Sequence, residues 1–348
     1  MAKIVSRAQS RKSPVTSHQS QGIEASDFLL AFEGKNKRVP VWFMRQAGRY
    51  LPQYQALKAS MPLRELFRNP EIAGAITLQP LEILGVDAAI LFADIMTMPS
   101  GMGYDIDFVD GKGPVIKNPV RYATDIQRAG KFIGVEHIDR TIKLINAVLP
   151  KSIPLIGFAG SPYTVLTYLC PRHSRMMFED PKSFHQFMKL LTDNTILYLK
   201  QQQQAGIKAF QLFDTWAGSL RPQEYADFVL PYVQKIFKSI KLPSIYYLKN
   251  CAHLFDLMEK SGAQMLSVCE TVDIAQIKTS KGIQGNLLNA MLYAPDKILL
   301  AEVEVLLKAA KKHHRKYIFN LNHGVLPPTD PLKLKAVVEA VHRFKWHP

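Results

Sequence analysis

Residues 39–52 read Val-Pro-Val-Trp-Phe-Met-Arg-Gln-Ala-Gly-Arg-Tyr-Leu-Pro, and this stretch decides how the rest of the chain is interpreted. Its apolar first half is short enough to form one buried strand. Arg45 and Arg49 then follow, four residues apart, and they share one face if this part is helical. Gly48 between them permits backbone conformations that other residues resist. A guanidinium is a permanent cation whose planar donors fit a carboxylate or phosphate, so the stretch predicts an anion site at the end of a buried strand.

The alternative interpretation of Arg45 and Arg49 is a pair of surface arginines at the start of a helix.

The chain has 348 residues, and 47% of them are hydrophobic, enough for a sizeable core in one large domain or two small ones. No window approaches the roughly 18–20 apolar residues of a membrane span, and no apolar run typical of a secretory signal opens the chain. Three scattered cysteines, Cys170, Cys251 and Cys269, favour a reducing compartment, so we expect a cytoplasmic protein.

The formal net charge of +15 permits a nucleic acid, a membrane surface or an anionic small molecule as partner. The basic residues are spread along the chain, with clusters in the N-terminal tail and at residues 308–316. The second cluster is typical of the solvated C-terminal end of a helix, where the helix dipole favours cations. Aromatic residues are not interleaved with these clusters and no nucleic-acid-binding motif occurs, so we expect a small-molecule substrate and neither nucleic acid nor membrane as partner.

Residues 1–23 differ from the rest of the chain, because they contain few large apolar residues, many Ser and Gln, and no acidic residue. Such a segment buries too little apolar surface to fold, so we predict a disordered basic tail followed by one folded domain at residues 24–348. Arginine, serine and a lack of acids also describe an organellar transit peptide. A plastid or other organelle is therefore the alternative location.

Eight short apolar, β-rich runs follow the tail, and most are separated by stretches with helical periodicity. This alternation predicts an α/β fold with a parallel sheet closed as a single (β/α)8 or TIM barrel. A doubly wound open sheet is the alternative, but the glycine-rich dinucleotide turn after the first strand is absent. The predicted strands are residues 39–44, 88–92, 153–158, 209–213, 244–248, 265–268, 282–284 and 317–321. The predicted helices are residues 69–84, 126–149, 181–204, 222–240, 253–261, 295–312 and 330–344.

One segment breaks the alternation after the second predicted strand. Residues 101–114 have alternating apolar positions around a Gly-Lys-Gly turn. This pattern predicts an inserted β-hairpin.

Polar side chains follow several predicted strands at their carboxyl ends, where barrels of this kind place their chemistry. Arg45 and Arg49 follow the first strand, and Asp94 follows the second. Three more polar residues follow other strands: Tyr168, Thr215 and His323. Each also has a structural interpretation, as a helix cap, a packed ring or a satisfied core histidine. An aspartate among apolar residues is costly to bury unless it meets donors, so the set favours one polar site at the barrel mouth.

Residues 42–52 resemble the signature of the uroporphyrinogen decarboxylase family. Further motifs occur in that family's order and extend the resemblance over roughly residues 25–345. These motifs are Phe-Ala-Asp-Ile at 92–95, Gly-Lys-Gly-Pro at 111–114, Gly-Phe-Ala-Gly at 157–160, Thr-Tyr at 167–168, Gln-Leu-Phe-Asp at 211–214, Gly-Asn at 285–286 and Asn-Leu-Asn-His-Gly at 320–324.

The resemblance implies decarboxylation of the four acetate side chains of uroporphyrinogen III to give coproporphyrinogen III, a step of haem and chlorophyll synthesis. It implies a homodimer that uses no cofactor and no metal. Asp94 matches the aspartate that receives the pyrrole N–H groups, and Arg45 and Arg49 match carboxylate-binding arginines, so these three are the predicted catalytic residues. The predicted substrate-binding residues are the same three with Gln46, Ala47, Gly48, Tyr168, Thr215 and His323.

The chain departs from the family's usual pattern at four places. Thr215 stands where the family usually has Ser, and Asn322 stands where it usually has Gly. Val-Cys-Glu-Thr-Val at 268–272 replaces Leu-Asp-Trp-Thr-Val, and Gly-Asn-Leu-Leu-Asn at 285–289 replaces Gly-Asn-Leu-Asp-Pro. The last two departures lie near the sixth and seventh predicted strands, where we expect them to change the loop geometry but not the core pocket.

A different activity on the same fold is zinc-dependent methyl transfer from methylated corrinoids or amines. That chemistry requires thiolate and imidazole ligands. Cys251, His253 and Cys269 are the candidates, since they follow the fifth and sixth predicted strands. No later cysteine completes a ligand set, so the sequence favours the decarboxylase.

Overall fold

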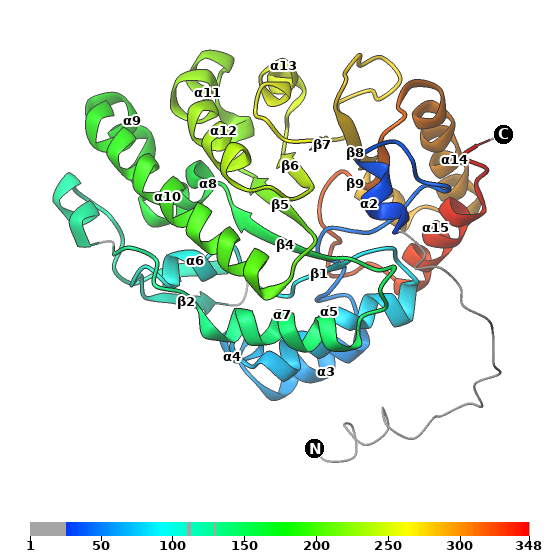
Figure 1. The fold of residues 1–348 in the computed structure, drawn as a ribbon, viewed down its shortest axis with the longest axis horizontal. Coiled ribbons are helices and arrows are strands. Elements are labelled where there is room, and N and C mark those ends of the chain that lie inside the picture. The colour runs from blue at the N-terminus through cyan, green and yellow to red at the C-terminus, as the bar shows by residue number, and fades with distance from the viewer. Residues whose placement is uncertain (1–25, 110–112, 129, 348) are drawn as a thin grey trace.

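The computed structural model describes residues 26–109, 113–128 and 130–347. Seven parallel strands form one curled sheet in the order β1-β4-β5-β6-β7-β8-β9, with helices along its outer side (Figure 1). The strands of this sheet are β1 (Ala89–Ile90), β4 (Leu155–Gly160), β5 (Ala209–Asp214), β6 (Ser244–Leu248), β7 (Met265–Ser267), β8 (Gly282–Leu287) and β9 (Tyr317–Leu321). Each strand pairs with the next one in the chain, which is the order of a (β/α)8 barrel.

The eighth member of the barrel is the first predicted strand, residues 39–44. It forms a single parallel bridge, between Val41 and Phe319 of β9. The Phe319 N–H donates to the Pro40 carbonyl at 2.9 Å, and the Asp87 N–H donates to the Val41 carbonyl at 2.8 Å. The segment therefore lies between β9 and the start of β1, and the predicted barrel is confirmed. The segment is shorter as a strand than predicted because Pro40 has no N–H to donate to a ladder.

The outer helices also connect the end of the chain to its beginning, because the last helix, α15, packs against α5. Helix α5 packs against α7, α7 against α10 and α10 against α12, while α15 packs against both α14 and α5. The helices are α2 (Asp27–Ala31), α3 (Pro52–Ser60), α4 (Leu63–Arg68), α5 (Pro70–Leu84), α6 (Thr97–Ser100), α7 (Glu136–Val148), α8 (Pro162–Leu169), α9 (His173–Glu179), α10 (Pro181–Ala205), α11 (Pro222–Phe228), α12 (Leu230–Ser239), α13 (Phe255–Glu259), α14 (Asp296–His313) and α15 (Pro331–Arg343). Short 3-10 turns are η1 (Ala123–Arg128), η2 (Ala217–Ser219), η3 (Ala252–Leu254) and η4 (Asn289–Tyr293).

Three predicted helices were wrong in extent. The helix predicted at 253–261 begins as the 3-10 turn η3, and α13 covers only Phe255–Glu259. The helix predicted at 126–149 begins only at Glu136, because Gly134 adopts a positive φ of 103° that a helix cannot contain. The helix predicted at 222–240 is two helices, α11 and α12, since Pro231 lacks an N–H and opens the second one.

The predicted hairpin is confirmed, although it starts a few residues later than predicted. Strands β2 (Ile106–Val109) and β3 (Gly113–Ile116) pair antiparallel, and the residues that join them lie outside the described ranges. The predicted tail, residues 1–23, also lies outside them. Among the described residues, no helix has the length and apolarity needed to cross a membrane.

A polar chain crosses the interior of the barrel. The indole N–H of Trp42 donates to the side-chain oxygen of Gln284 in β8 at 2.9 Å. The amide nitrogen of Gln284 in turn donates to Gln211 of β5 and to Ser267 of β7, each at 2.9 Å. All four side chains are buried. Because a buried polar group is costly without a partner, these bonds fix the 39–44 segment against strands on the far side of the barrel.

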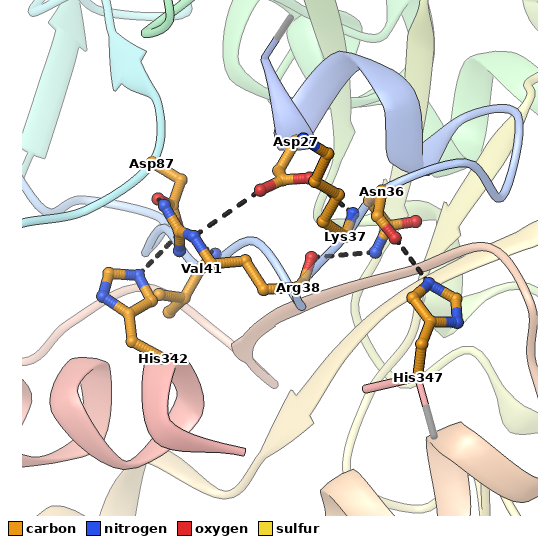
Figure 2. A network of polar contacts seen from close by, with 8 residues as sticks. All are labelled: Asp27, Asn36, Lys37, Arg38, Val41, Asp87, His342 and His347. Atoms are coloured by element: carbon orange, nitrogen blue, oxygen red, sulfur yellow. Dashed lines mark hydrogen bonds and ion pairs between the residues drawn. The ribbon is translucent and has the colours of Figure 1, made fainter. Parts of the chain in front are cut away.

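Asp87, just before β1, binds residues from the first segment and from the last helix of the barrel (Figure 2). Its buried carboxylate accepts hydrogen bonds from the Val41 N–H at 2.8 Å, from Arg38 at 2.5 and 3.1 Å, and from the ring nitrogen of His342 in α15 at 2.9 Å. Burial raises the pKa of Asp87, but the bonds from His342 and Arg38 outweigh it and leave the pKa below its usual value. One carboxylate thus joins the first segment, the first strand and the last helix.

We expect Asp87→Asn to lower the free energy of unfolding by about 2–3 kcal/mol at pH 7, measured by urea denaturation, because the amide offers one acceptor oxygen to the same donors. A lowered native pKa stabilises the fold above the unfolded carboxyl pKa of about 4, and this gain is lost as pH falls through the native value. The difference between wild type and variant should therefore shrink in acid.

The matched control is Asp105→Asn, at an exposed carboxylate 3.9 Å from Lys117. An exposed pair of this kind contributes little, so a change below about 0.5 kcal/mol is expected. Equal losses in the two variants would contradict a special role for Asp87.

Candidate active site

Arg45 lies near both Asp94 and His323, at the carboxyl ends of the strands. The Arg45 side chain lies directly over Gly324, where an added Cβ would come within 2.5 Å of the arginine Cδ. Arg45 is also close enough to act electrostatically on Asp94 and on His323. The predicted anion site and the predicted carboxylate are therefore neighbours, although they come from different strands.

The loop that carries the arginines differs from the sequence expectation. Residues 44–50 form turns rather than a helix, so Arg45 and Arg49 do not share a helical face. The residue with a positive φ is Arg45 itself, at 61°, and Gly48 has no such angle. A non-glycine residue in this region costs roughly 1 kcal/mol or more and persists where its surroundings hold it. Gly48 therefore does not use the conformations that glycine permits, and the strained residue of this loop is Arg45.

The buried side chain of Gln46 anchors this loop to the barrel interior. Its buried side chain accepts from the Phe43 N–H at 3.0 Å and donates to the Ala88 carbonyl at 2.9 Å. Its carbonyl accepts from the Tyr50 hydroxyl at 2.8 Å. Ala47 is half-buried against the core and Gly48 is buried. The side chain of Gln46 therefore supports the arginines from inside the protein.

Neither Arg45 nor Arg49 forms an ion pair among the described residues. Arg45 and Arg49 are exposed, and no carboxylate in residues 26–109, 113–128 and 130–347 lies within ion-pair distance of either guanidinium. Elsewhere the chain pairs its arginines readily, as with Arg221 and Glu224 at 2.5 Å. Two unpaired guanidiniums are suited to bind an anionic ligand.

Asp94 is only partly exposed and has an unusual ionisation. Burial raises its pKa to about 6, although a hydrogen bond from the Met96 N–H at 2.8 Å and the charge of Arg45 act in the opposite direction. The interpretation of Asp94 as a helix cap fails, because Met96 is the N-cap residue of α6. A carboxylate whose pKa lies well above its usual range is a candidate for a functional site.

An arc of aromatic rings lines the same mouth, and the sequence interpretation missed it. Phe158 of β4 contacts Phe213 of β5, Phe213 contacts Tyr247 of β6, and Tyr247 contacts His323, with ring centroids 5.6, 5.7 and 6.3 Å apart. The signal was available, since Phe213 and Tyr247 are the penultimate residues of their strands and are paired in register. The Tyr247 hydroxyl is buried and has no hydrogen-bond partner among the described residues.

His323 is held neutral at one end of this arc. Burial and the neighbouring positive charge of Arg45 lower the pKa of His323. A neutral imidazole beside an unpaired guanidinium can donate or accept a hydrogen bond without adding charge.

Tyr168 and Thr215 lie on the β4–β5 side of the mouth. The Tyr168 ring contacts Trp216 edge to face, with centroids 6.3 Å apart, and Thr215 immediately precedes that tryptophan. Tyr168 and Trp216 also line a pocket with Tyr163, Thr167, His173 and Ser219. Trp216 is 44% exposed, so this side presents an apolar surface to solvent.

Comparison with known proteins identifies the family. A family profile described as Uroporphyrinogen decarboxylase (URO-D) matches residues 24–344. The chain belongs to the uroporphyrinogen decarboxylase family. A protein named Uroporphyrinogen decarboxylase from Thermodesulfovibrio yellowstonii is 41% identical, covering 92% of this chain and 98% of its own. One of the same name from Nocardia farcinica is 38% identical, covering 95% and 99%.

Solved structures agree on the fold. A methyltransferase from Methanosarcina mazei superposes with a TM-score of 0.75 at 20% identity, covering 91% of this chain and 98% of that one. At this identity the likeness supports the barrel and carries no argument about the reaction.

Departures from the family pattern come together in the structure. The side-chain amide of Asn322 donates to Glu270 at 2.8 Å, and its oxygen accepts from the Asn289 N–H at 2.8 Å. The Asn289 side chain donates to the Gly324 carbonyl at 3.3 Å. Three loops, after β7, β8 and β9, are thus joined beside His323. The residues that depart from the family pattern are therefore hydrogen-bonded to one another, and they join these three loops.

The alternative zinc site is not assembled. The sulfur atoms of Cys251 and Cys269 are 3.3 Å apart, but the Nε2 atom of His253 contacts the Leu220 carbonyl at 2.9 Å. Among the described residues, no group of three His, Cys, Asp or Glu side chains has the spacing to hold a metal ion. The proposed combination of two thiolates and an imidazole was wrong.

We expect Asn322→Ala and Glu270→Ala to be energetically coupled by about 1 kcal/mol in a double-mutant cycle, measured by urea unfolding, because each removes the same hydrogen bond. The matched cycle pairs Asn322→Ala with Glu304→Ala, a surface glutamate that binds Lys308 on α14. That cycle should be additive within about 0.5 kcal/mol. Additivity in both cycles would contradict the network.

Proposed function

We propose that this chain decarboxylates the four acetate side chains of uroporphyrinogen III to give coproporphyrinogen III, without a cofactor. Family membership over residues 24–344 supports the reaction. The observation that carries the proposal is the meeting of Asp94 with Arg45 at the barrel mouth, at the positions of two family motifs. The M. mazei methyltransferase is the competing precedent, and it shares only the fold.

The substrate's chemistry fits the surface of the site. Uroporphyrinogen carries eight carboxylates around an apolar macrocycle, and the mouth combines two unpaired guanidiniums with an aromatic arc. We propose that Arg45 and Arg49 bind carboxylates of the substrate, while the arc packs against the ring system. The net charge of +15 would steer such a polyanion toward the protein.

The reaction needs an electron sink but no external one. Loss of CO2 leaves a carbanion, and protonation of the pyrrole carbon beside the acetate arm turns the ring into the sink that receives those electrons. The protonated ring bears a positive charge that its N–H groups share. A fixed carboxylate facing those groups stabilises this charge more in the transition state than in the ground state. Asp94 is the proposed carboxylate, and one of the two arginines holds the reacting acetate.

The remaining predicted residues have supporting roles in this proposal. Tyr168, Thr215 and His323 are proposed substrate contacts, since they lie on the two sides of the mouth. Gln46, Ala47 and Gly48 form the loop that carries the arginines. No step requires a metal or a prosthetic group.

The other proposed properties rest on the sequence and the family resemblance. They are a folded domain at residues 24–348 after a tail at 1–23, a homodimer, and a location in the cytoplasm or, if the tail is a transit peptide, in a plastid or another organelle. Neither nucleic acid nor membrane is a proposed partner.

The test is to incubate purified protein anaerobically with uroporphyrinogen III and a chelator, without added cofactor. Products are counted by carboxylate number after chromatography. We expect seven-, six- and five-carboxylate intermediates followed by the four-carboxylate product. No loss of carboxylates, or a reaction that needs zinc and a methyl donor, would overturn the proposal.

We expect Asp94→Ala to reduce kcat at least 100-fold, since the transition-state charge loses its counter-charge. Glu304→Ala, at an exposed carboxylate that pairs with Lys308 along the outer helix α14, should leave kcat within twofold. Near-normal turnover in the Asp94 variant would remove Asp94 from the mechanism.

The pH dependence should report the same group. Because the ionised carboxylate is required, kcat/KM should fall about tenfold per pH unit as pH drops below about 6, the pKa to which burial raises Asp94. The measurement is a profile between pH 5 and 8 for the free enzyme. Residual activity of the Asp94→Ala variant should lack this inflection, and an inflection common to both proteins would assign it to another group.

A further inference from the structure

Two buried cysteines face each other where β6 and β7 end. The Sγ atoms of Cys251 and Cys269 are 3.3 Å apart. The Cys251 N–H points at the Cys269 sulfur at 3.1 Å, and the Cys269 N–H points at the Cys251 sulfur at 3.3 Å. The backbone of each residue therefore holds the other's sulfur in contact with its own.

We propose that Cys251 and Cys269 form an oxidisable dithiol, which hydroperoxides such as hydrogen peroxide convert into an intramolecular disulfide. A disulfide bond is about 2.05 Å long, so the sulfurs need to approach by only about 1.3 Å. Side-chain rotation within two adjacent loops can supply this movement. The pair lies beside the site described above, but neither cysteine has a part in the proposed decarboxylation.

The two sulfurs have different roles in the oxidation. The Cys269 sulfur receives hydrogen bonds from the Cys251 thiol and from the Thr271 hydroxyl, at 3.3 and 3.1 Å, and the bond from Cys251 is the main cause of its lowered pKa. The same shared proton keeps the pKa of Cys251 above its usual value. Cys269 is therefore the nucleophile, and Cys251 is the resolving thiol.

Disulfide formation takes two steps. The Cys269 thiolate attacks one peroxide oxygen, the O–O bond breaks, and the departing hydroxide takes a proton to become water, which leaves a sulfenic acid on Cys269. The Cys251 sulfur then attacks the Cys269 sulfur, the S–O bond breaks, and hydroxide leaves with the thiol proton as a second water. Two thiols lose two electrons and two protons, and one peroxide is reduced to two waters.

The loop after β7 gives a small oxidant its access. Residues 268–281, between β7 and β8, contain no helix, and Glu270 and Thr271 next to Cys269 are exposed. Segments with little secondary structure open locally at low free-energy cost. Cys170 offers a comparison within the same chain, because burial raises the pKa of its thiol and no described thiol faces it.

Formation of the disulfide would affect the proposed active site through the hydrogen bonds that this loop makes. Glu270 follows Cys269 directly and accepts the bond from Asn322, the residue before His323. The Cys269 carbonyl accepts from Asn286 of β8 at 2.8 Å. Drawing Cys269 toward Cys251 pulls on both contacts, so we expect the disulfide to lower activity, an effect that rests on the proposed decarboxylase function.

The experiment treats the full-length protein with hydrogen peroxide, blocks remaining thiols with an alkylating agent under denaturing conditions, and counts them by mass spectrometry. Wild type and Cys170→Ser should each lose two alkylatable thiols and yield a linked peptide pair containing Cys251 and Cys269. Cys251→Ser should form no linkage and proceed to higher oxides of Cys269. Cys269→Ala serves as the second variant if the serine substitution impairs folding.

Activity is followed in the same samples. Oxidised wild type should lose activity at least fivefold and regain it with dithiothreitol, whereas the Cys251→Ser protein should show no dithiothreitol-reversible loss. Retention of all three thiols in wild type, or loss of Cys170 as fast as the pair, would overturn the dithiol. A disulfide without any change in activity would overturn its link to the site. The mass measurement needs no decarboxylase assay, so failure of the proposed function remains distinguishable.

Discussion

The structure depends on how residues 39–44 close the sheet. A strand that contains Pro40 cannot pair fully, and only Val41 forms a bridge to β9. Side chains replace the missing ladder at three levels of the barrel. Asp87 accepts the Val41 N–H at one end, Trp42 donates to Gln284 in the interior, and Gln46 donates to the Ala88 carbonyl at the mouth. The segment is therefore fixed along its whole length, although it has almost no regular secondary structure.

This closure explains why the loop at residues 44–50 can hold Arg45 in a strained backbone conformation. Arg45 adopts a positive φ immediately after a segment that is anchored on both sides and from within. The side chain then passes over Gly324, where any larger residue would occupy the space that the arginine needs. The position of the cation thus follows from the fold, and among the described residues no carboxylate forms an ion pair with the Arg45 guanidinium. A flexible loop with the same residues would place its charge less accurately, and orientation is worth as much as charge in such a site.

Much of this arrangement followed from the sequence, for physical reasons that also explain the failures. Alternating apolar runs and helical periods determine a barrel, and polar residues after strands determine its mouth, because both patterns reflect burial. The backbone of the 45–49 loop was not predictable in this way, since local rules assign a positive φ to Gly48 and the tertiary contacts assign it to Arg45. The bonds of Asn322 to Glu270 and Asn289 join residues far apart in sequence. Because these contacts run between separate loops, the local sequence around each residue does not predict them.

Three aspartates of this barrel differ in their surroundings and in the direction or cause of their pKa shifts. Asp87 meets Val41, Arg38 and His342, and its pKa is lowered, so it serves as a stable anchor. Asp214 is buried and accepts hydrogen bonds from the neutral hydroxyls of Thr164 and Tyr246, and burial raises its pKa. Its contacts therefore lie within the protein core, where they serve the structure. Asp94 accepts one backbone hydrogen bond, lies near a cation and is partly exposed, which leaves it ionisable near pH 6. Only the third has a charge that a ligand can reach and alter. The proposed role of Asp94 therefore rests on its surroundings, because neither residue type nor burial alone distinguishes it from the other two aspartates.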